Sequence, residues 1–188
     1  KLSDKSIFYA NTGFYSKQPF FGNLYTDDRY SGEWINLDDA NEEITGYEIG
    51  YSYTSENLRL IVDAYSTEWG NRSFRISTQN EAEDQLRYNL TGVGQLHKGV
   101  EFQADLRYLE GTDIKLFATL GNWLYQGSAD YNLTTESAST GSITTSSGSI
   151  SIQEVKVGRA PQTSFGISLK NYLRDYLSAV SYTHLRAH

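Results

Sequence analysis

Residues 100–108 read VEFQADLRY and alternate without exception between apolar and polar side chains. The apolar members are Val100, Phe102, Ala104, Leu106 and Tyr108, and the polar members are Glu101, Gln103, Asp105 and Arg107. Successive side chains of a β-strand point to opposite faces of the sheet. The stretch therefore predicts a strand with one apolar face and one fully polar face.

The same period of two recurs along the chain. Residues 46–54 place three tyrosines and Ile49 on one face, and residues 58–64, after a short turn at 55–57, place Leu58, Leu60 and Val62 on one face. Residues 114–120 alternate in the same way, and strands are also expected at about 6–16 and 163–171. The sequence predicts an all-β, antiparallel protein with about six strands.

Composition excludes several classes of function. The 188 residues include no cysteine, which excludes disulfides, thiolate metal sites and cysteine nucleophiles. A net charge of -7 argues against nucleic acid as a partner. No apolar run approaches the roughly 18 residues of a transmembrane helix, whereas a membrane β-barrel would hide its spans in alternation.

Connections of two lengths separate the predicted strands. Short ones are expected at 55–57, 110–113 and 172–175, and long ones at about 17–44, 70–96 and 127–161. The last includes a Ser/Thr/Gly-rich tract at 134–151, which we expect to be mobile. Strands of about ten residues with short turns at one end and long loops at the other are typical of outer-membrane barrels.

Five segments resemble the C-terminal barrel region of TonB-dependent outer-membrane receptors, particularly those of the Bacteroidetes type. They are residues 7–21, the hairpin 46–69, QLHKGVEF at 95–102, LGNWLY at 120–125 and VGRAPQT at 157–163. The resemblance implies a barrel of about 22 strands around a plug. Such receptors import scarce nutrients such as iron chelates, cobalamin or glycans with energy relayed by the TonB complex. The plug and the TonB-contacting segment would lie outside this sequence.

The resemblance also sets the expected boundaries and location. Residues 1–179 are expected to be a partial receptor barrel in a bacterial outer membrane, with short periplasmic turns and long extracellular loops. Residues 180–188 resemble a translated sequencing adapter and are expected to be a non-native tail, so we set aside His184 and His188. Both ends of the natural protein are expected to lie beyond this chain.

Three sets of residues receive predicted roles. Facing outer-membrane lipid we expect Val100, Phe102, Leu106 and Leu116. Facing the lumen or plug we expect Glu101, Gln103, Asp105 and Arg107. As ring-stacking contacts for the nutrient in the first long loop we expect Tyr25, Tyr30 and Trp34.

Catalysis is not expected. Outside the tail His97 is the sole histidine, and no G-x-S-x-G motif occurs, so the chain is predicted to be non-enzymatic, with no metal and no cofactor. Two alternatives stay open at this stage. One is a passive porin or an adhesin barrel, and the other is a soluble β-sandwich carbohydrate-binding module.

Overall fold

The computed structural model describes residues 3–25, 29, 32–34, 41–109, 111–158, 160–174 and 177–187. The regular structure in these residues is nine β-strands and one short 3-10 helix. They are β1 (Ser6–Lys17), η1 (Phe21–Leu24), β2 (Glu42–Thr54), β3 (Leu58–Gln79), β4 (Gln85–Leu109), β5 (Thr112–Gln126), β6 (Ser128–Glu136), β7 (Ile143–Ser151), β8 (Thr163–Arg174) and β9 (Leu177–Ala187). Every strand pair is antiparallel, so the predicted all-β, antiparallel class is confirmed.

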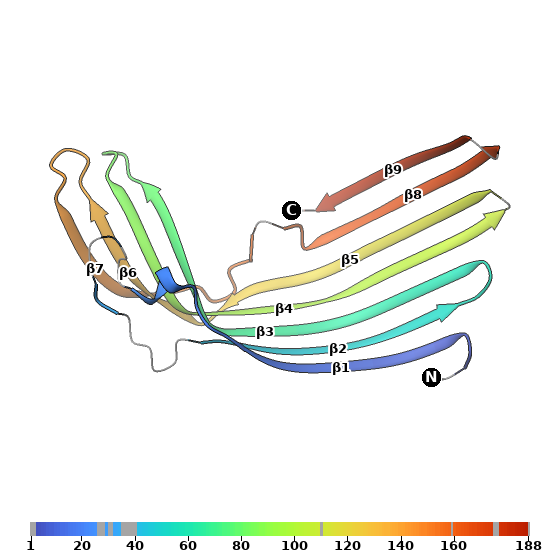
Figure 1. The fold of residues 1–188 in the computed structure, drawn as a ribbon, viewed down its shortest axis with the longest axis horizontal. Coiled ribbons are helices and arrows are strands. Elements are labelled where there is room, and N and C mark those ends of the chain that lie inside the picture. The colour runs from blue at the N-terminus through green and yellow to red at the C-terminus, as the bar shows by residue number, and fades with distance from the viewer. Residues whose placement is uncertain are drawn as a thin grey trace.

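Seven strands form what we call the main sheet, in the order β1-β2-β3-β4-β5-β8-β9. This sheet is curved like a trough and is open, with β1 and β9 at its two edges (Figure 1). The connections from β2 to β3 and from β4 to β5 lie at one end, which we call the turn end (Figure 1). The opposite end, where β1 leads into η1, is the loop end.

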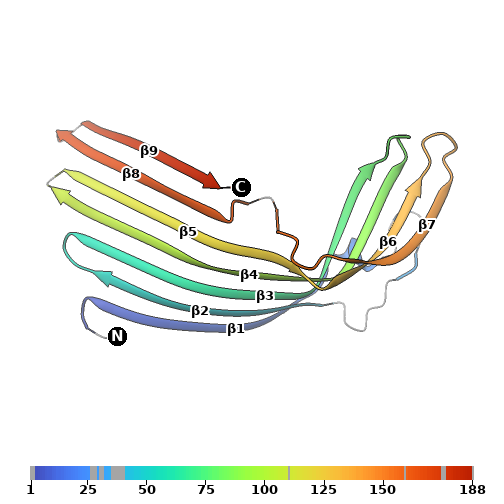
Figure 2. The ribbon, with the colours of Figure 1, turned by 180° about the vertical axis from the view of Figure 1, so that it is seen from behind.

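Strands β3 and β4 run on past the main sheet at the loop end, with lengths of 22 and 25 residues. Their far halves pair with each other, β4 pairs onward with β6, and β6 pairs with β7. We call these four strand segments the distal sheet, which rises at an angle from the main sheet (Figure 2).

The distal sheet corrects two sequence predictions. Residues 70–96 were expected to form a long loop and 134–151 a mobile tract, but the structure folds them into the hairpins β3–β4 and β6–β7. Alternating bulky residues explain the difference, since Tyr88 pairs with Leu133 and Leu90 with Tyr131 across β4 and β6. Because 80–84 is a short turn, short and long connections do not alternate strictly. The count of about six strands was too low.

Three residues with left-handed backbone conformation lie at the bend between the two sheets. Asn71 in β3, Gly92 in β4 and Gly127 between β5 and β6 have φ values of 54°, 69° and 71°. Glycine adopts this region freely, whereas other residues pay strain there. The β3–β4 register also shifts between Trp69 and Arg72. Three neighbouring strands therefore change direction together.

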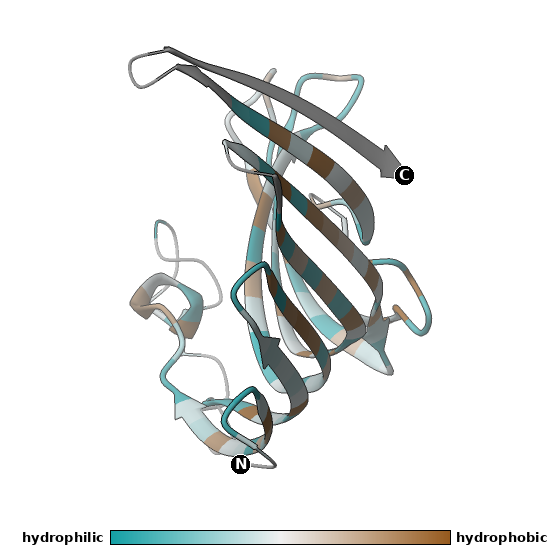
Figure 3. Ribbon diagram, turned by 90° about the vertical axis from the view of Figure 1, so that its right-hand side faces the viewer, coloured by the Kyte–Doolittle hydropathy of each residue, from teal (hydrophilic) through white to brown (hydrophobic). Residues whose placement is uncertain are grey.

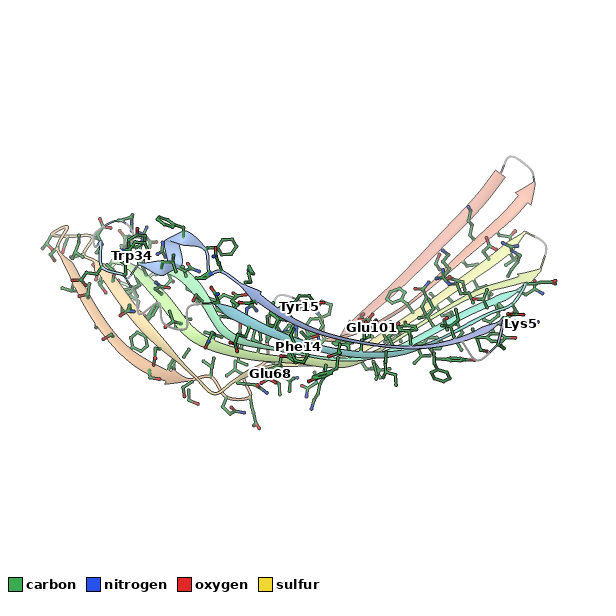
Figure 4. The ribbon with its side chains drawn as sticks, turned by 60° about the horizontal axis from the view of Figure 1, so that its bottom comes forward. Lys5, Phe14, Tyr15, Trp34, Glu68 and Glu101 are labelled. Carbon is green, nitrogen blue, oxygen red and sulfur yellow. The ribbon has the colours of Figure 1, made fainter. Side chains whose placement is uncertain are left out.

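The register sorts the side chains of the main sheet onto two different faces. One row across it reads Phe8, Tyr51, Val62, Phe102, Ala118 and Phe165, and the next row on the other face reads Tyr9, Gly50, Asp63, Glu101, Thr119 and Ser164. The alternation is visible as successive bands along the strands in Figure 3. Figure 4 places Phe14 and Glu68 on the convex side and Tyr15 and Glu101 on the concave side.

In the described residues, large apolar side chains of the convex face are exposed. Phe8, Leu120 and Phe165 are 55%, 62% and 50% exposed. In the part of the chain that the structure describes, the buried apolar side chains are Val93, Ala104 and Ala129. No helix there has the length and hydropathy needed to span a bilayer. The fold is thus a curved sheet with an exposed apolar outside.

Candidate ligand-binding site

Three aromatic rings meet at the loop end, and we call Phe21, Tyr25 and Trp34 the aromatic cluster. The ring centroids of Tyr25 and Trp34 are 4.6 Å apart at an interplanar angle of 36°. Phe21 lies edge-on to both, 5.4 Å from Tyr25 and 6.2 Å from Trp34. Phe21 and Trp34 are 68% and 52% exposed, and Trp34 lies on the concave side (Figure 4).

Local backbone structure brings the rings together. Phe21 is the first residue of the helix η1, two residues after Pro19. The backbone N–H of Asn23 donates a hydrogen bond of 2.8 Å to the Phe20 carbonyl. Tyr25 and Trp34 then face each other in an isolated antiparallel bridge. Directly opposed residues in such a bridge project to the same side, which is why their rings contact each other.

Asn89 of β4 fastens this loop to the distal sheet. Asn89 is 2% exposed. Its side-chain Nδ2 donates hydrogen bonds to the backbone carbonyls of Asn23 at 3.3 Å and Tyr25 at 2.7 Å. In return, Asn23 Nδ2 donates to the Ser73 carbonyl of β3 at 3.2 Å, and Arg75 of β3 donates to the Gly22 carbonyl. The first part of the connection from β1 to β2, residues 22–25, is therefore positioned by β3 and β4.

A cluster of charged side chains lies where β1 ends and β2 begins. The Glu42 side chain is 7% exposed and lies between Lys17 Nζ at 3.6 Å and Arg72 Nε at 3.7 Å. Arg72 also donates to the buried Gln95 and stacks over the Phe74 ring at 4.7 Å. A buried carboxylate needs such compensation, because an unpaired charge there would be costly. These contacts fix the start of β2 against the bend.

A second group of rings lies below the bend on the concave face. His97 of β4 stands between Trp69 of β3 and Trp123 of β5, with centroid distances of 4.5 Å and 5.0 Å. Trp123 Nε1 donates to the Tyr65 hydroxyl oxygen at 2.9 Å. The concave wall is thus aromatic near the loop end and becomes charged toward the turn end.

The predicted lumen-facing residues share the concave face. Gln103 Nε2 donates to Asp105 Oδ2 at 3.1 Å, and Arg107 Nε lies 3.5 Å from Asp113 Oδ1. A cavity of about 300 Å³ opens beside them at the turn end. Its lining includes Ser55, Asn57, Arg59, Asp105, Arg107 and Lys115.

The predicted lipid-facing residues share the convex face. Val100, Phe102 and Leu116 are 44%, 37% and 39% exposed, and Leu106 is half-buried. Of the predicted ligand contacts, Tyr25 and Trp34 are brought together, and Tyr30 lies outside the described residues. Sequence reasoning missed Phe21 and Asn89. The aromatic doublet after Pro19 was a usable signal for Phe21, whereas Asn89 has none without knowledge of the fold.

The tips of the two distal hairpins are joined by Asp84. Asn80 Nδ2 donates to Asp84 Oδ2 at 3.0 Å, and the Ala138 amide donates to Asp84 Oδ1 at 3.0 Å. The Asn80 hydrogen bond, followed by that from Ala138, holds the pKa of the Asp84 carboxyl below its usual value of 3.8. Together with the pairing of β4 and β6, this contact joins the hairpins β3–β4 and β6–β7 up to their tips.

Comparison with protein-family models, with curated proteins and with solved structures found no match to this chain. The described residues also hold no group of three or more His, Cys, Asp or Glu side chains suited to a metal ion. The chemistry that the site offers is ring stacking, since exposed aromatic faces bind flat apolar surfaces such as that of a sugar ring or a planar chelate.

Proposed function

We propose that this chain is part of the wall of an outer-membrane β-barrel of the TonB-dependent receptor type, which binds a scarce nutrient at the loop end and imports it. The observation that carries the proposal is the direction of curvature. The apolar face is convex and the charged face is concave. A water-soluble barrel packs apolar side chains inside, whereas an outer-membrane barrel turns them outward to lipid and keeps a polar interior.

The extent of the apolar face supports the same proposal. On β4 the apolar face covers Val100 to Leu106, with Leu96 beyond. Thr12, Tyr47 and Ser66 form one row across β1, β2 and β3 on the convex face. Between this row and the turn end, the paired residues of β1 to β5 and β8 place no charged side chain on the convex face. Eight to ten residues at about 3.3 Å each, tilted by about 40°, span about 20 to 25 Å. That height is close to the apolar band of outer-membrane barrels, which is about 25 Å.

The proposal that a nutrient binds at the loop end rests on the aromatic cluster, and the proposed energy source rests on the resemblance to TonB-dependent receptors. Long loops of such barrels face the outside, so the aromatic cluster would lie at the extracellular mouth. The backbone that carries Tyr25 is held before any ligand arrives, because Asn89 Nδ2 donates to the carbonyls of Asn23 and Tyr25. Coupling to the TonB complex would use plug segments outside this sequence, and the partners of the wall are outer-membrane lipid and the nutrient.

Cysteine scanning tests the wall directly, because this chain has no cysteine of its own to react. Any cysteine elsewhere in the complete gene product is first replaced with serine. Single cysteines at residues 100 to 105 are labelled in intact membranes with a charged maleimide. We expect reaction at positions 101, 103 and 105 and protection at positions 100, 102 and 104, with Ser139→Cys at the distal tip as the reactive control. Equal labelling at all six positions would contradict a lipid-facing band.

Nutrient uptake separates an energised receptor from a passive pore. The proposal expects uptake to stop when TonB is deleted while the barrel stays in the outer membrane and migrates differently after heating. Uptake that continues without TonB would identify a passive porin instead. Recovery of the complete product as a soluble monomer would exclude both and favour a β-sandwich binding module.

A further inference from the structure

Two lysines stand at the border of the convex apolar face on the loop-end side. We propose that Lys98 and Lys156, with Asn122 between them, bind the phosphate of an anionic lipid headgroup whose acyl chains lie on that face. This inference rests on the proposed function, because it needs the convex face to meet lipid. It assigns a binding site that is separate from the aromatic cluster on the concave side.

The register puts both lysines on the convex face. Lys98 of β4 is directly opposite Asn122 of β5, two residues from Val100 and therefore on the same face as it. Lys156 is directly opposite Leu124 of β5 in an isolated antiparallel bridge. Leu124 is two residues from Asn122 and shares its face, so the lysines flank β5 from its two sides.

The spacing suits one phosphate group. Two strand spacings of about 4.8 Å and a shift of two residues, about 6.6 Å, place the two Cα atoms on a diagonal of about 12 Å. Lysine carries its ammonium on a long flexible stem that can lie along an apolar surface. Both ammonium groups can therefore reach a phosphate above Asn122, whose amide can donate a further hydrogen bond.

The lysines are available for this role. Both are exposed, and among the described residues neither takes part in an ion pair. Among the described residues, Glu68 of β3 lies on the side of β4 away from Asn122, Glu43 of β2 lies one row farther toward the loop end, and Glu154 precedes Lys156 by two residues. The residues directly opposite the lysines are Ser66 and Asn122 for Lys98 and Leu124 for Lys156, so no acidic residue stands between the two lysines on β5.

The neighbouring surface suits acyl chains. Toward the turn end the next rows are uncharged, and Val100, Leu120 and Phe165 are 44%, 62% and 50% exposed. A headgroup at the lysines would place its chains on these three residues. Lysines near the end of a membrane-spanning element extend toward the headgroup layer, where they attract anionic lipid.

The test uses the complete gene product in nanodiscs made of equal parts phosphatidylcholine and phosphatidylglycerol. Native mass spectrometry measures how much of each lipid stays bound to the wild type, K98Q, K156Q and K98Q/K156Q. The matched control is K115Q/K170Q, which removes the same charge from the concave face. We expect retention of phosphatidylglycerol to fall about fivefold for each lysine removed at the site, with phosphatidylcholine and the control unchanged.

Four results would overturn the proposal. Equal phosphatidylglycerol retention by the wild type and the double variant would show that the lysines do not select the headgroup. Displacement of the lipid by inorganic phosphate would show a free-anion site instead. If the protein inserts with the alternating cysteine pattern but has no lipid preference, the lipid site alone fails. If it does not insert, both proposals fail.

Discussion

The hydroxyl oxygen of Tyr65 on β3 accepts a hydrogen bond from the indole Nε1 of Trp123 on β5, at 2.9 Å and across the strand between them. Gly99 of β4 makes this crossing possible, because a Cβ there would lie 2.7 Å from the Tyr65 hydroxyl oxygen. Tyr9 of β1 crosses Gly50 of β2 in the same way and donates to Asp63 of β3. Glycines on the concave face thus let rings join strands that are not neighbours.

Replacing Gly99 with alanine should weaken the sheet. The new methyl group would approach both the Tyr65 hydroxyl and the Leu120 carbonyl oxygen at 2.7 Å, and overpacking of this kind costs about 1 to 3 kcal/mol. Urea unfolding of the complete protein in detergent measures the change. Gly46→Ala is the control, because the nearest atom to its added Cβ is Thr67 Oγ1 at 3.9 Å. Equal stability of the two variants would argue against the crossing.

If the convex face meets lipid as proposed, arginine on that face should disrupt the proposed barrel. Phe102→Arg or Leu116→Arg would place a charge in the middle of the apolar band, at a cost of about 2 to 4 kcal/mol near the bilayer midplane. Gln103→Arg, one residue away on the concave face, should have little effect. Heat-modifiable migration and the yield of folded protein in the outer membrane report the difference. Normal folding of both convex variants would contradict the assigned face.

Aspartate in place of Asn89 should release the aromatic cluster. The substitution removes the amide donor and sets a carboxylate against the carbonyls of Asn23 and Tyr25, at a cost of about 1 to 3 kcal/mol. Limited proteolysis should then cleave the β1–β2 loop faster than in the wild type. Asn132→Asp on β6, which faces Asn89 in the register, is the control. Unchanged cleavage in Asn89→Asp would mean that other contacts hold the loop.

If the aromatic cluster binds a nutrient as proposed, alanine in place of Trp34 should weaken that binding. One stacked ring contributes about 0.5 to 1.5 kcal/mol, so affinity should fall about twofold to tenfold. Calorimetry with a ferric siderophore, cobalamin and a maltooligosaccharide as probes would identify which one binds and how far it is weakened. Phe20→Ala is the control, since that ring is 71% exposed and lies outside the cluster beside Lys17. Full affinity in Trp34→Ala would exclude the cluster from the site.

Acid should separate the two distal hairpin tips. The pKa of Asp84 is lower in the folded chain than in the unfolded chain, so its stabilising contribution is complete above the unfolded value of 3.8 and is lost as pH falls through the lower folded value. Hydrogen exchange at Ala138, corrected for intrinsic rates, should speed up across that range. Asp84→Asn should remove this pH dependence, and a variant that keeps it would assign the effect to another group.

Much of the main sheet was predictable from sequence, because period two is strongest where a strand has one apolar and one polar face. Residues 100–108 specify both faces of β4 by themselves. The distal parts of β3 and β4 were missed because Asn71 and Gly92 interrupt the period at the bend. Beyond such a break, the apolar residues no longer fall on the alternate positions expected from the first half of the strand. The second half of the strand then resembles a polar loop.

The site was less predictable, because it depends on contacts between distant segments. Exposed aromatic residues in a long loop pointed to Tyr25 and Trp34, and the structure brings their rings together. The anchor at Asn89 is 64 residues from Tyr25 along the chain. Neither it nor the crossing of Gly99 by Tyr65 follows from sequence without the strand register, which single-sequence patterns do not contain.

The scarcity of buried apolar side chains also has a thermodynamic meaning. A globular domain gains most of its stability by moving apolar surface from water into its own interior. Here Val93, Ala104 and Ala129 are the buried apolar residues of the described chain, and the large apolar side chains Phe8, Leu120 and Phe165 of the convex face are exposed. If the convex face meets lipid, as proposed, the lipid supplies the apolar surroundings that an interior core supplies in a globular domain. On that proposal, insertion and folding of this chain are a single event.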